Sequence, residues 1–374
     1  QIQPSPSSQH STLSSLTPPP SLSIPVIFGF QKPSDVLAPS DAVRQQILLE
    51  AKKGVFDVPM YLGGNVTPDG KDLKNAGQVP NLKSFMDLLS ALEVELKFPA
   101  KTLRIRGYLR ASLTAADAKH EDFGPGKTSI MTPNVRQNIK TLITELLSQN
   151  KYQLESSRVD LLVLDFEDIV ASNYDPADLA PDDEGTVVQI ANFVKELKAL
   201  GLNKKIGVFS SGFINKNWFP PEKATPIGSP WAVSPRNFIS PEDAETLYVF
   251  GVDVILLGAY ENFPDQAKVS ALVDVSTYGP FHHTYESFLR FQIDTVRAIA
   301  QRRPQINLDP GKNLILAIPA FKTSQTADIV ATEIAVAAVK NLIKTGVILS
   351  LKAEAFDFGS TDTAERTLLL NSQE

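Results

Sequence analysis

The sequence predicts an α/β protein, a single (β/α)8 TIM barrel with long loops on its C-terminal face, from two observations. Eight short apolar runs rich in β-branched residues alternate with amphipathic segments whose apolar residues recur at helical spacing. This alternation favours parallel strands with crossover helices, because a tight turn cannot join parallel neighbours. A count of eight such units within 374 residues favours a closed barrel over an open doubly wound sheet.

Strands are expected at 24–30, 55–62, 103–109, 160–166, 205–210, 252–260, 313–320 and 347–353. Helices are expected at 42–53, 82–96, 134–150, 185–200, 241–250, 284–303 and 326–344, with a short one at 362–370. Pro133 and Pro241 each follow a Thr or Ser that can cap a first turn, and Gly201 ends a helix. The first run lacks a following G-x-G-x-x-G turn, so a dinucleotide-binding fold lacks its main marker.

The composition excludes several classes of protein. With 43% hydrophobic and 21% charged residues, the chain is typical of soluble globular proteins. Its 36 basic and 42 acidic side chains give a net charge of −6 without a basic stripe, which argues against a nucleic-acid or anionic-membrane partner. No run approaches the roughly 18 to 20 apolar residues of a membrane span. Cysteine is absent, which excludes disulfides, thiolate metal sites and cysteine nucleophiles.

The N-terminal segment differs from the rest. Residues 1–23 contain eight Ser, five Pro and no charged residue, which is typical of a flexible or polyproline-like tether. We therefore expect a disordered tether at 1–23 and one barrel domain at 24–374. Because the first residue is Gln rather than Met, we also expect a processed chain that is secreted or held at the cell surface. A disordered cytosolic tail is the alternative, and a monomer is expected.

Acidic residues end the fourth predicted strand, in the run Asp160-Leu-Leu-Val-Leu-Asp165-Phe-Glu167-Asp168. Side chains alternate along a strand, so Val163, Asp165 and Glu167 should point together into the barrel mouth. Two neighbouring acids repel each other and burial adds to the effect, so one should keep its proton near neutral pH. Cleavage of a glycosidic bond needs such a proton and such a charge. The alternative is that these acids only cap the next helix or face solvent.

This run resembles the D-x-x-D-x-D-x-E signature on the fourth barrel strand of glycoside hydrolase family 18, the chitinases and endo-β-N-acetylglucosaminidases. Asp160, Asp165 and Glu167 match it, while Val163 stands where the family has its second Asp. Weaker likeness covers most of 24–358. Residues 65–70 resemble the loop after the family's second strand, 257–261 its M-x-Y-D with Gly258 at the Met position, and 314–321 its seventh strand.

The resemblance implies a substrate-assisted retaining mechanism, in which the N-acetyl group of the sugar attacks the anomeric carbon and forms an oxazolinium. Glu167 would be the general acid and base, Asp165 would orient the acetamide, and Tyr260 would hydrogen-bond its carbonyl oxygen. Asp160 and Glu261 would take part in substrate binding. No cofactor is expected, and no metal, because the histidine pair 282–283 lacks a third ligand at defined spacing.

Aromatic side chains are candidates for sugar binding, because the apolar face of a pyranose packs on a ring. Trp218 and Trp231 lie in the predicted loop after the fifth strand, and Tyr278 lies in the loop after the sixth. These rings would line outer subsites or, alternatively, pin the loops onto the barrel. The eighth strand lacks the Trp that lies under the sugar in the family. Three residues could replace it, Glu354, Phe356 and Phe358, and we include Phe356 among the candidate binding residues.

Three functions remain open. The leading one is hydrolysis of glycans with β-linked N-acetylglucosamine, in chitin, N-glycan cores or peptidoglycan-like polymers. A carbohydrate-binding pseudo-enzyme is the second, since Val163 and the missing Trp count against activity. The third is a family 25 lysozyme-like muramidase. Residues 206–213, followed by Trp218, resemble a strand of that family, although the first strand here lacks that family's acid.

The third predicted strand carries Arg104, Arg106 and Arg110, which could bind an anionic sugar or pair with acids inside the barrel.

Overall fold

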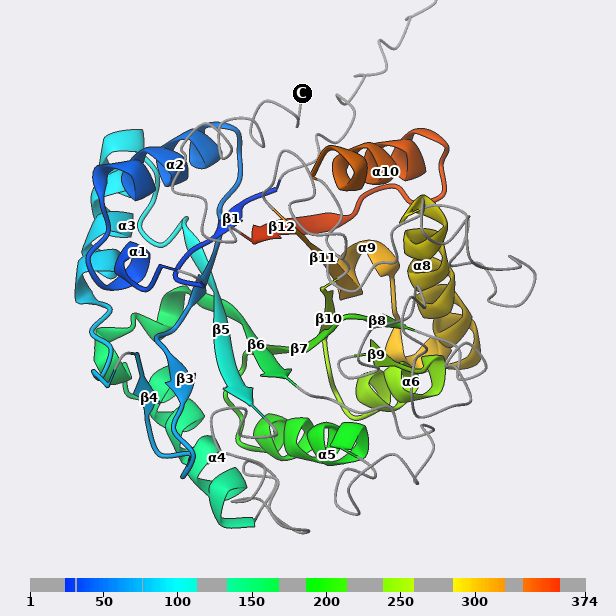
Figure 1. The fold of residues 1–374 in the computed structure, drawn as a ribbon, viewed down its shortest axis with the longest axis horizontal. Coiled ribbons are helices and arrows are strands. Elements are labelled where there is room, and N and C mark those ends of the chain that lie inside the picture. The colour runs from blue at the N-terminus through cyan, green and yellow to red at the C-terminus, as the bar shows by residue number, and fades with distance from the viewer. Residues whose placement is uncertain are drawn as a thin grey trace, which may run out of the picture.

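The computed structural model describes residues 24–30, 32–75, 77–112, 133–167, 186–213, 238–258, 285–319 and 332–356. Within these ranges eight parallel strands form one sheet in the order β1-β12-β11-β10-β7-β6-β5-β2. Figure 1 shows the strands as a ring with the helices outside it. The predicted (β/α)8 barrel is therefore confirmed. The boundary expected between a tether at 1–23 and the barrel domain lies outside the described residues.

The barrel strands are β1 (Val26–Ile27), β2 (Asp57–Tyr61), β5 (Arg104–Ser112), β6 (Val159–Glu167), β7 (Lys205–Ser210), β10 (Val254–Leu257), β11 (Leu314–Pro319) and β12 (Lys352–Phe356). The helices are α1 (Ser34–Leu37), α2 (Asp41–Lys52), α3 (Lys83–Leu96), α4 (Pro133–Ser148), α5 (Thr186–Ala199), α6 (Pro241–Val249), α8 (Tyr285–Arg302), α9 (Pro310–Asn313) and α10 (Thr332–Lys344). Smaller elements are the ladders β3 (Asn65–Val66) with β4 (Leu73–Lys74) and β8 (Gly212–Phe213) with β9 (Phe238–Ile239), and the 3-10 turns η2 (Lys151–Gln153), η3 (Ser156–Arg158) and η8 (Pro304–Ile306).

The barrel closes at a narrow seam on either side of β1. On one side β1 pairs in parallel with β12. On the other side Phe28 forms an isolated parallel bridge with Met60 of β2. The N–H of Phe28 donates to the carbonyl of Pro59, and the carbonyl of Phe28 accepts from the N–H of Tyr61, both at 3.0 Å. The strand nearest the N-terminus thus joins the last strand to the second.

The helix boundaries follow from local chemistry. Ser240 caps α6: its hydroxyl accepts from the N–H of Asp243 at 3.1 Å, and the Asp243 carboxylate accepts from the N–H of Ser240 at 3.3 Å. Pro241 occupies the first turn, where its missing N–H costs nothing. The capping predicted at this position is confirmed.

The apolar core has two parts. The larger one lies between the strands and the helices, where for example the rings of Phe28 and Phe85 are 5.9 Å apart. The smaller one fills the barrel interior and consists of Ile27, Tyr61, Tyr108, Leu161, Val163, Phe209, Val254, Leu256, Ile315, Ala317 and Phe356. These residues occupy alternate strand positions, as inward-facing side chains must. They identify the inner face of each strand.

One strand lies later than the sequence suggests. β12 spans 352–356 rather than 347–353. Gly346, with φ of +72°, follows α10, and the apolar residues after it form a connection in which Leu349 is 85% exposed. The expected start of the eighth strand is therefore wrong, because the apolar residues after α10 have the composition of a strand but form the connection to β12. Residues 326–331 and 362–370, expected to be helical, lie outside the described residues.

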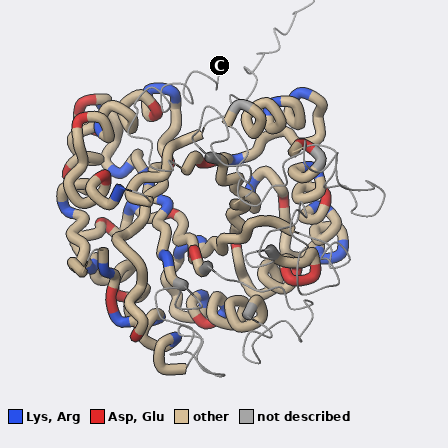
Figure 2. Tube along the Cα trace, in the orientation of Figure 1, with Lys and Arg blue, Asp and Glu red and all other residues tan. Residues whose placement is uncertain are grey.

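Charged residues of both signs are interspersed over the helices around the barrel (Figure 2). None of the described helices combines the length and the apolar character that a crossing of the bilayer requires.

Candidate active site

Asp165 and Tyr61 meet across the carboxyl end of the barrel. Asp165 is the third residue from the end of β6, and Tyr61 is the last residue of β2. The Tyr61 hydroxyl donates a hydrogen bond of 2.6 Å to Oδ2 of Asp165. Both side chains are only 3% exposed. A phenol that donates to a carboxylate stabilises its ionised form, so this contact favours a negative charge on Asp165.

Glu167 is the final residue of β6. Its backbone pairs in register with Ser112 of β5, as that of Asp165 pairs with Arg110. The chain thus places Asp165 and Glu167 two residues apart at the carboxyl end of one strand. The side chain of Glu167 lies outside the described residues.

Four rings pack together beside Asp165, and we call them the aromatic cluster: Phe30, Tyr61, Tyr108 and Phe356. Ring centroids are 5.1 Å apart for the stacked Tyr61 and Tyr108, 5.3 Å for Phe30 and Tyr61, and 4.9 Å for Phe30 and Phe356. Such separations are typical of favourable aromatic pairs. Cζ of Arg110 lies 5.4 Å from the ring centre of Phe30, at cation–π distance. Phe356, a predicted binding residue, thus lies in the same cluster as Tyr61.

A charged network lies deeper in the barrel. Glu354 of β12 is fully buried and accepts hydrogen bonds from Nη1 of Arg106 and from the Tyr108 hydroxyl. Nη2 of Arg106 donates to Oδ2 of Asp57 at 2.6 Å, and Nη2 of Arg104 lies 3.3 Å from Oδ1 of Asp57. Arg106 therefore pairs with acids inside the barrel, one of the two alternatives that the sequence left open, while Arg104 pairs with Asp57 from a side chain that is 50% exposed.

Burial and charge shift the pKa values within this network. Burial, aided by the charge of Glu354, raises the pKa of Tyr108 well above its usual value. Burial favours a lower pKa for Arg106, but the charges of Glu354 and Asp57 outweigh it and raise that pKa. Burial favours a higher pKa for Asp57, but Arg106 outweighs it and lowers that pKa. Tyr108 thus stays a neutral donor, and Arg106 stays a cation between two acids.

Two departures from the family motifs lie inside the barrel. Val163 is fully buried in the interior core, two residues before Asp165 on the same face of β6. At Gly258 an added Cβ would lie 2.5 Å from Cζ of Phe209, so the Phe209 ring occupies the space that a side chain would need. Val163 therefore stands in place of the acid of the family motif, and the Phe209 ring fills the space beside Gly258 that the Met side chain would need.

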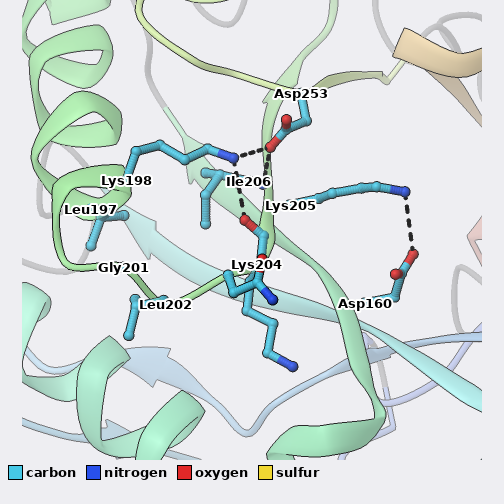
Figure 3. A pocket seen from close by; sticks show the side chains of 10 residues that line it. Asp160, Leu197, Lys198, Gly201, Leu202, Lys204, Lys205, Ile206 and Asp253 are labelled. Carbon is cyan, nitrogen blue, oxygen red and sulfur yellow. Dashed lines mark hydrogen bonds and ion pairs between the residues drawn. The ribbon is translucent and has the colours of Figure 1, made fainter.

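Asp160 lies at the opposite end of β6 from Asp165. Its Oδ2 is 3.8 Å from Nζ of Lys205. It lines a pocket of about 540 Å³ at the amino ends of β6 and β7, where Lys198 also pairs with Asp253 (Figure 3). The structure does not bring Asp160 together with Asp165.

The remaining predicted site residues lie outside the described residues: Trp218, Trp231, Tyr260, Glu261 and Tyr278. The same holds for the histidine pair at 282–283. In the described part of the chain, no group of three His, Cys, Asp or Glu side chains could hold a metal ion.

Sequence reasoning missed Tyr61 and Tyr108. A usable signal was present, because both stand an even number of residues from other inward positions, Tyr61 from Asp57 and Tyr108 from Arg106. The two tyrosines alternate with outward apolar residues, Tyr61 at the carboxyl end of β2 and Tyr108 in the middle of β5. Polar aromatic residues at inward positions of a barrel mouth could have been proposed as site residues.

No protein-family model matches this sequence, and no curated protein matches it. Solved structures to which the chain is similar include active domain 2 of a thermostable chitinase from Pyrococcus furiosus, at 12% identity over 95% of each chain, with a TM-score of 0.48. A GH18 chitinase from Pseudoalteromonas aurantia matches at 10% identity over 89% of this chain and 97% of that one, with a TM-score of 0.45. A fungal endo-β-N-acetylglucosaminidase of glycosyl hydrolase family 18 matches at 13% identity over 84% and 90%, with a TM-score of 0.40.

Proposed function

We propose that this protein is a glycoside hydrolase acting on glycans that contain β-linked N-acetylglucosamine. The observation that supports this most directly is the placement of Asp165. It is a buried carboxylate near the carboxyl end of a barrel strand, two residues before Glu167. Its Oδ2 accepts a hydrogen bond of 2.6 Å from the Tyr61 hydroxyl. Active sites of (β/α)8 enzymes lie at this end of the barrel.

The proposed reaction retains the configuration at the anomeric carbon. Glu167 follows Asp165 by two residues and ends β6 at the carboxyl end of the barrel. Glu167 would give its proton to the glycosidic oxygen while the acetamide carbonyl oxygen of the sugar attacks the anomeric carbon and the bond to the leaving group breaks. Asp165 would accept a hydrogen bond from the acetamide N–H and balance the positive charge of the oxazolinium. A water molecule would then open this ring and give its proton to Glu167.

The aromatic cluster supports a carbohydrate as the ligand. Phe356 and Phe30 pack edge to face at 4.9 Å next to Tyr61, which itself contacts Asp165. Tyr61, Tyr108 and Phe356 are at most 3% exposed, so a sugar whose acetamide reached Asp165 would meet the cluster at the half-buried ring of Phe30. The axial C–H face of a pyranose packs well on aromatic side chains.

Carbohydrate binding without turnover is the second candidate function. It is favoured by Val163, which leaves Asp165 without an acidic neighbour below it on the strand. A site of this kind would still hold an acetamide but would transfer a proton less effectively.

The two functions are separated by testing the wild-type protein with chitooligosaccharides, a high-mannose glycopeptide and peptidoglycan, with products read by mass spectrometry. Turnover should fall by at least about 100-fold in E167Q and in D165N, as expected when a general acid or a charge at the reacting centre is lost. E95Q is the matched control, because Glu95 lies on the outer helix α3 and pairs with Arg44. Binding of a glycan without turnover would favour the pseudo-enzyme, and neither binding nor turnover would refute the proposal.

A further inference from the structure

We infer that Tyr61 is a positioning residue of Asp165: its hydroxyl, carried by β2, holds one oxygen of the carboxylate on β6. The contact itself stands on geometry, and the catalytic consequence rests on the proposed function. Because the hydroxyl donates to Oδ2 at 2.6 Å, it determines which carboxylate oxygen turns toward β2. Both groups are buried, so solvent offers little competition for this bond.

The Tyr61 ring is itself held in place. It stacks on Tyr108 with centroids 5.1 Å apart and planes 29° apart, and it contacts Phe30, which follows β1. The Tyr108 hydroxyl donates to Glu354, which Arg106 also contacts. The position of the Tyr61 hydroxyl is therefore set by a continuous series of packed and hydrogen-bonded groups that reaches the charged network. Locked supporting groups of this kind hold functional side chains at a defined geometry.

The inward residue before Asp165 on β6 is Val163, which has no side-chain donor. Val163 is fully buried and apolar, and an added Cβ at Gly207 on the neighbouring strand would lie 3.3 Å from Cγ2 of Val163. A buried carboxylate above apolar groups is stable only with hydrogen-bond donors from the side. Tyr61 supplies such a donor from β2, two strands away in the sheet.

Several titratable groups belong to the elements around Asp165, and a substitution of Tyr61 by Phe leaves all of them in place. They are Tyr108 and Arg110 on β5, Glu167 on β6 and Glu354 on β12. The ring of residue 61 also stays in its stack. The variant Y61F therefore removes one hydroxyl and little else.

Y152F is the matched control. The Tyr152 hydroxyl donates to the carboxylate of Asp72 and accepts from the N–H of Leu73 at 3.1 Å, so this variant removes a tyrosine–carboxylate bond away from the mouth together with one backbone contact. The first measurement is the titration of the Asp165 carboxyl by ¹³C NMR in the full chain, with the resonance assigned from D165N. Losing a donor to the ionised form moves a titration to higher pH. We expect the Asp165 midpoint to rise by about one pH unit in Y61F and to stay at its wild-type value in Y152F.

The second measurement is the pH profile of glycan hydrolysis. In Y61F we expect kcat to fall about tenfold with KM within about twofold, and the acidic limb of the profile to move to higher pH by the same amount as the NMR midpoint. Y152F should reproduce the wild-type profile. If Tyr61 had only a packing role, Y61F would lower the yield of folded protein without moving the acidic limb of the pH profile.

The outcomes separate the two claims. An unchanged Asp165 midpoint in Y61F would overturn the inference whatever the activity. A moved midpoint with unchanged kcat would overturn the positioning role. A moved midpoint in a protein that hydrolyses none of the three glycans would refute the proposed function and leave Tyr61 as the group that orients Asp165.

Discussion

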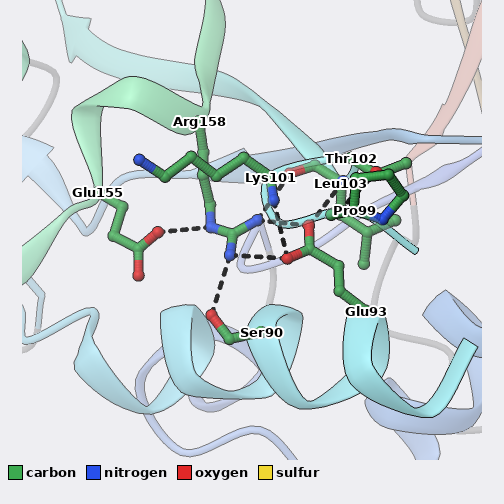
Figure 4. Close-up of polar contacts among 8 residues, drawn as sticks. All are labelled: Ser90, Glu93, Pro99, Lys101, Thr102, Leu103, Glu155 and Arg158. Carbon is green, nitrogen blue, oxygen red and sulfur yellow. Dashed lines mark hydrogen bonds and ion pairs between the residues drawn. The ribbon is translucent and has the colours of Figure 1, made fainter. Parts of the chain in front are cut away.

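Arg158 donates two parallel hydrogen bonds to Glu93, from Nη1 to Oε1 at 2.6 Å and from Nη2 to Oε2 at 3.0 Å (Figure 4). Their side chains are only 2% and 3% exposed. Glu93 lies on α3 and also accepts from the N–H groups of Lys101 and Leu103, directly before β5, while Arg158 directly precedes β6. This pair joins one helix to the amino ends of two barrel strands, the end opposite Asp165.

The variant R158M should lower the free energy of unfolding by about 3 to 5 kcal/mol, because it leaves the carboxylate of Glu93 buried without its charge partner. E155Q is the control, since Glu155 contacts the same arginine at 2.7 Å but has a side chain 39% exposed, and it should cost less than about 1 kcal/mol. Urea unfolding of both variants measures the difference. Equal costs would show that burial of this pair does not matter.

Asp57 should make the stability depend on pH. Burial favours a higher pKa, but the charge and hydrogen bond of Arg106, with the charge of Arg104, lower the pKa of Asp57 in the folded protein. A lowered folded pKa means that the stabilisation is present above the unfolded value, about 4, and is lost as the pH falls through the folded value. We expect D57N to be less stable than wild type at pH 7, with the difference narrowing by pH 3.

Urea unfolding at the two pH values tests this expectation, with D87N as the control because Asp87 forms an exposed ion pair with Lys83 on α3. The control should show a small difference from wild type at both values. A gap between D57N and wild type that stayed constant from pH 7 to pH 3 would contradict the role given to Arg106.

A side chain at position 258 should compete with Phe209. G258A places a methyl group where Cζ and Cε2 of the ring would be 2.5 and 2.6 Å away, so we expect a cost of about 1 to 3 kcal/mol. F209L shortens the ring side chain and makes room. The double variant should therefore be more stable than the sum of the single effects predicts, a coupling that a double-mutant cycle in urea measures. Additive costs would mean that the ring moves aside freely.

Loss of the cap of α6 should destabilise the protein by about 1 kcal/mol. S240A removes the hydroxyl that accepts from the Asp243 N–H at 3.1 Å, a bond that is buried here. S40A removes the corresponding group from α2, where the bond to the N–H of Val43 is 3.4 Å long and only partly buried. Thermal unfolding should rank S240A below S40A, and the reverse order would show that bond length does not decide the cost of a cap.

The sequence predicted strand boundaries well where a short apolar run is bounded by polar residues at both ends. β7 begins and ends at 205 and 210 as expected, because a short apolar run lies between the charged Lys205 and the serine pair 210–211. The eighth strand was misplaced because Val347 and Ile348 carry the same apolar, β-branched signal in a connection. Composition identifies residues that suit a strand, while hydrogen-bond partners decide which of them form one.

The sequence could predict which residues of one strand belong to the candidate site, but not which residues of other strands they contact. Asp165 follows from the alternation within one strand and its position near the strand end. Its contact with Tyr61 joins residues 104 positions apart. Alternation along β2 places Tyr61 on the inner face of the barrel but does not pair it with Asp165, because the curvature of the closed sheet decides which inward side chains of β2 and β6 meet.

The seam at β1 has a consequence for synthesis of the chain. Val26 pairs with Ala355, so the first strand has no neighbour on that side until nearly the whole described chain has emerged from the ribosome. Strands β2, β5, β6 and β7 can assemble in order of translation, whereas an unfinished polypeptide that stopped before β12 would expose two unpaired sheet edges. Truncated or stalled products should therefore aggregate, and chaperones that shield strand edges should associate with the nascent protein late in its translation.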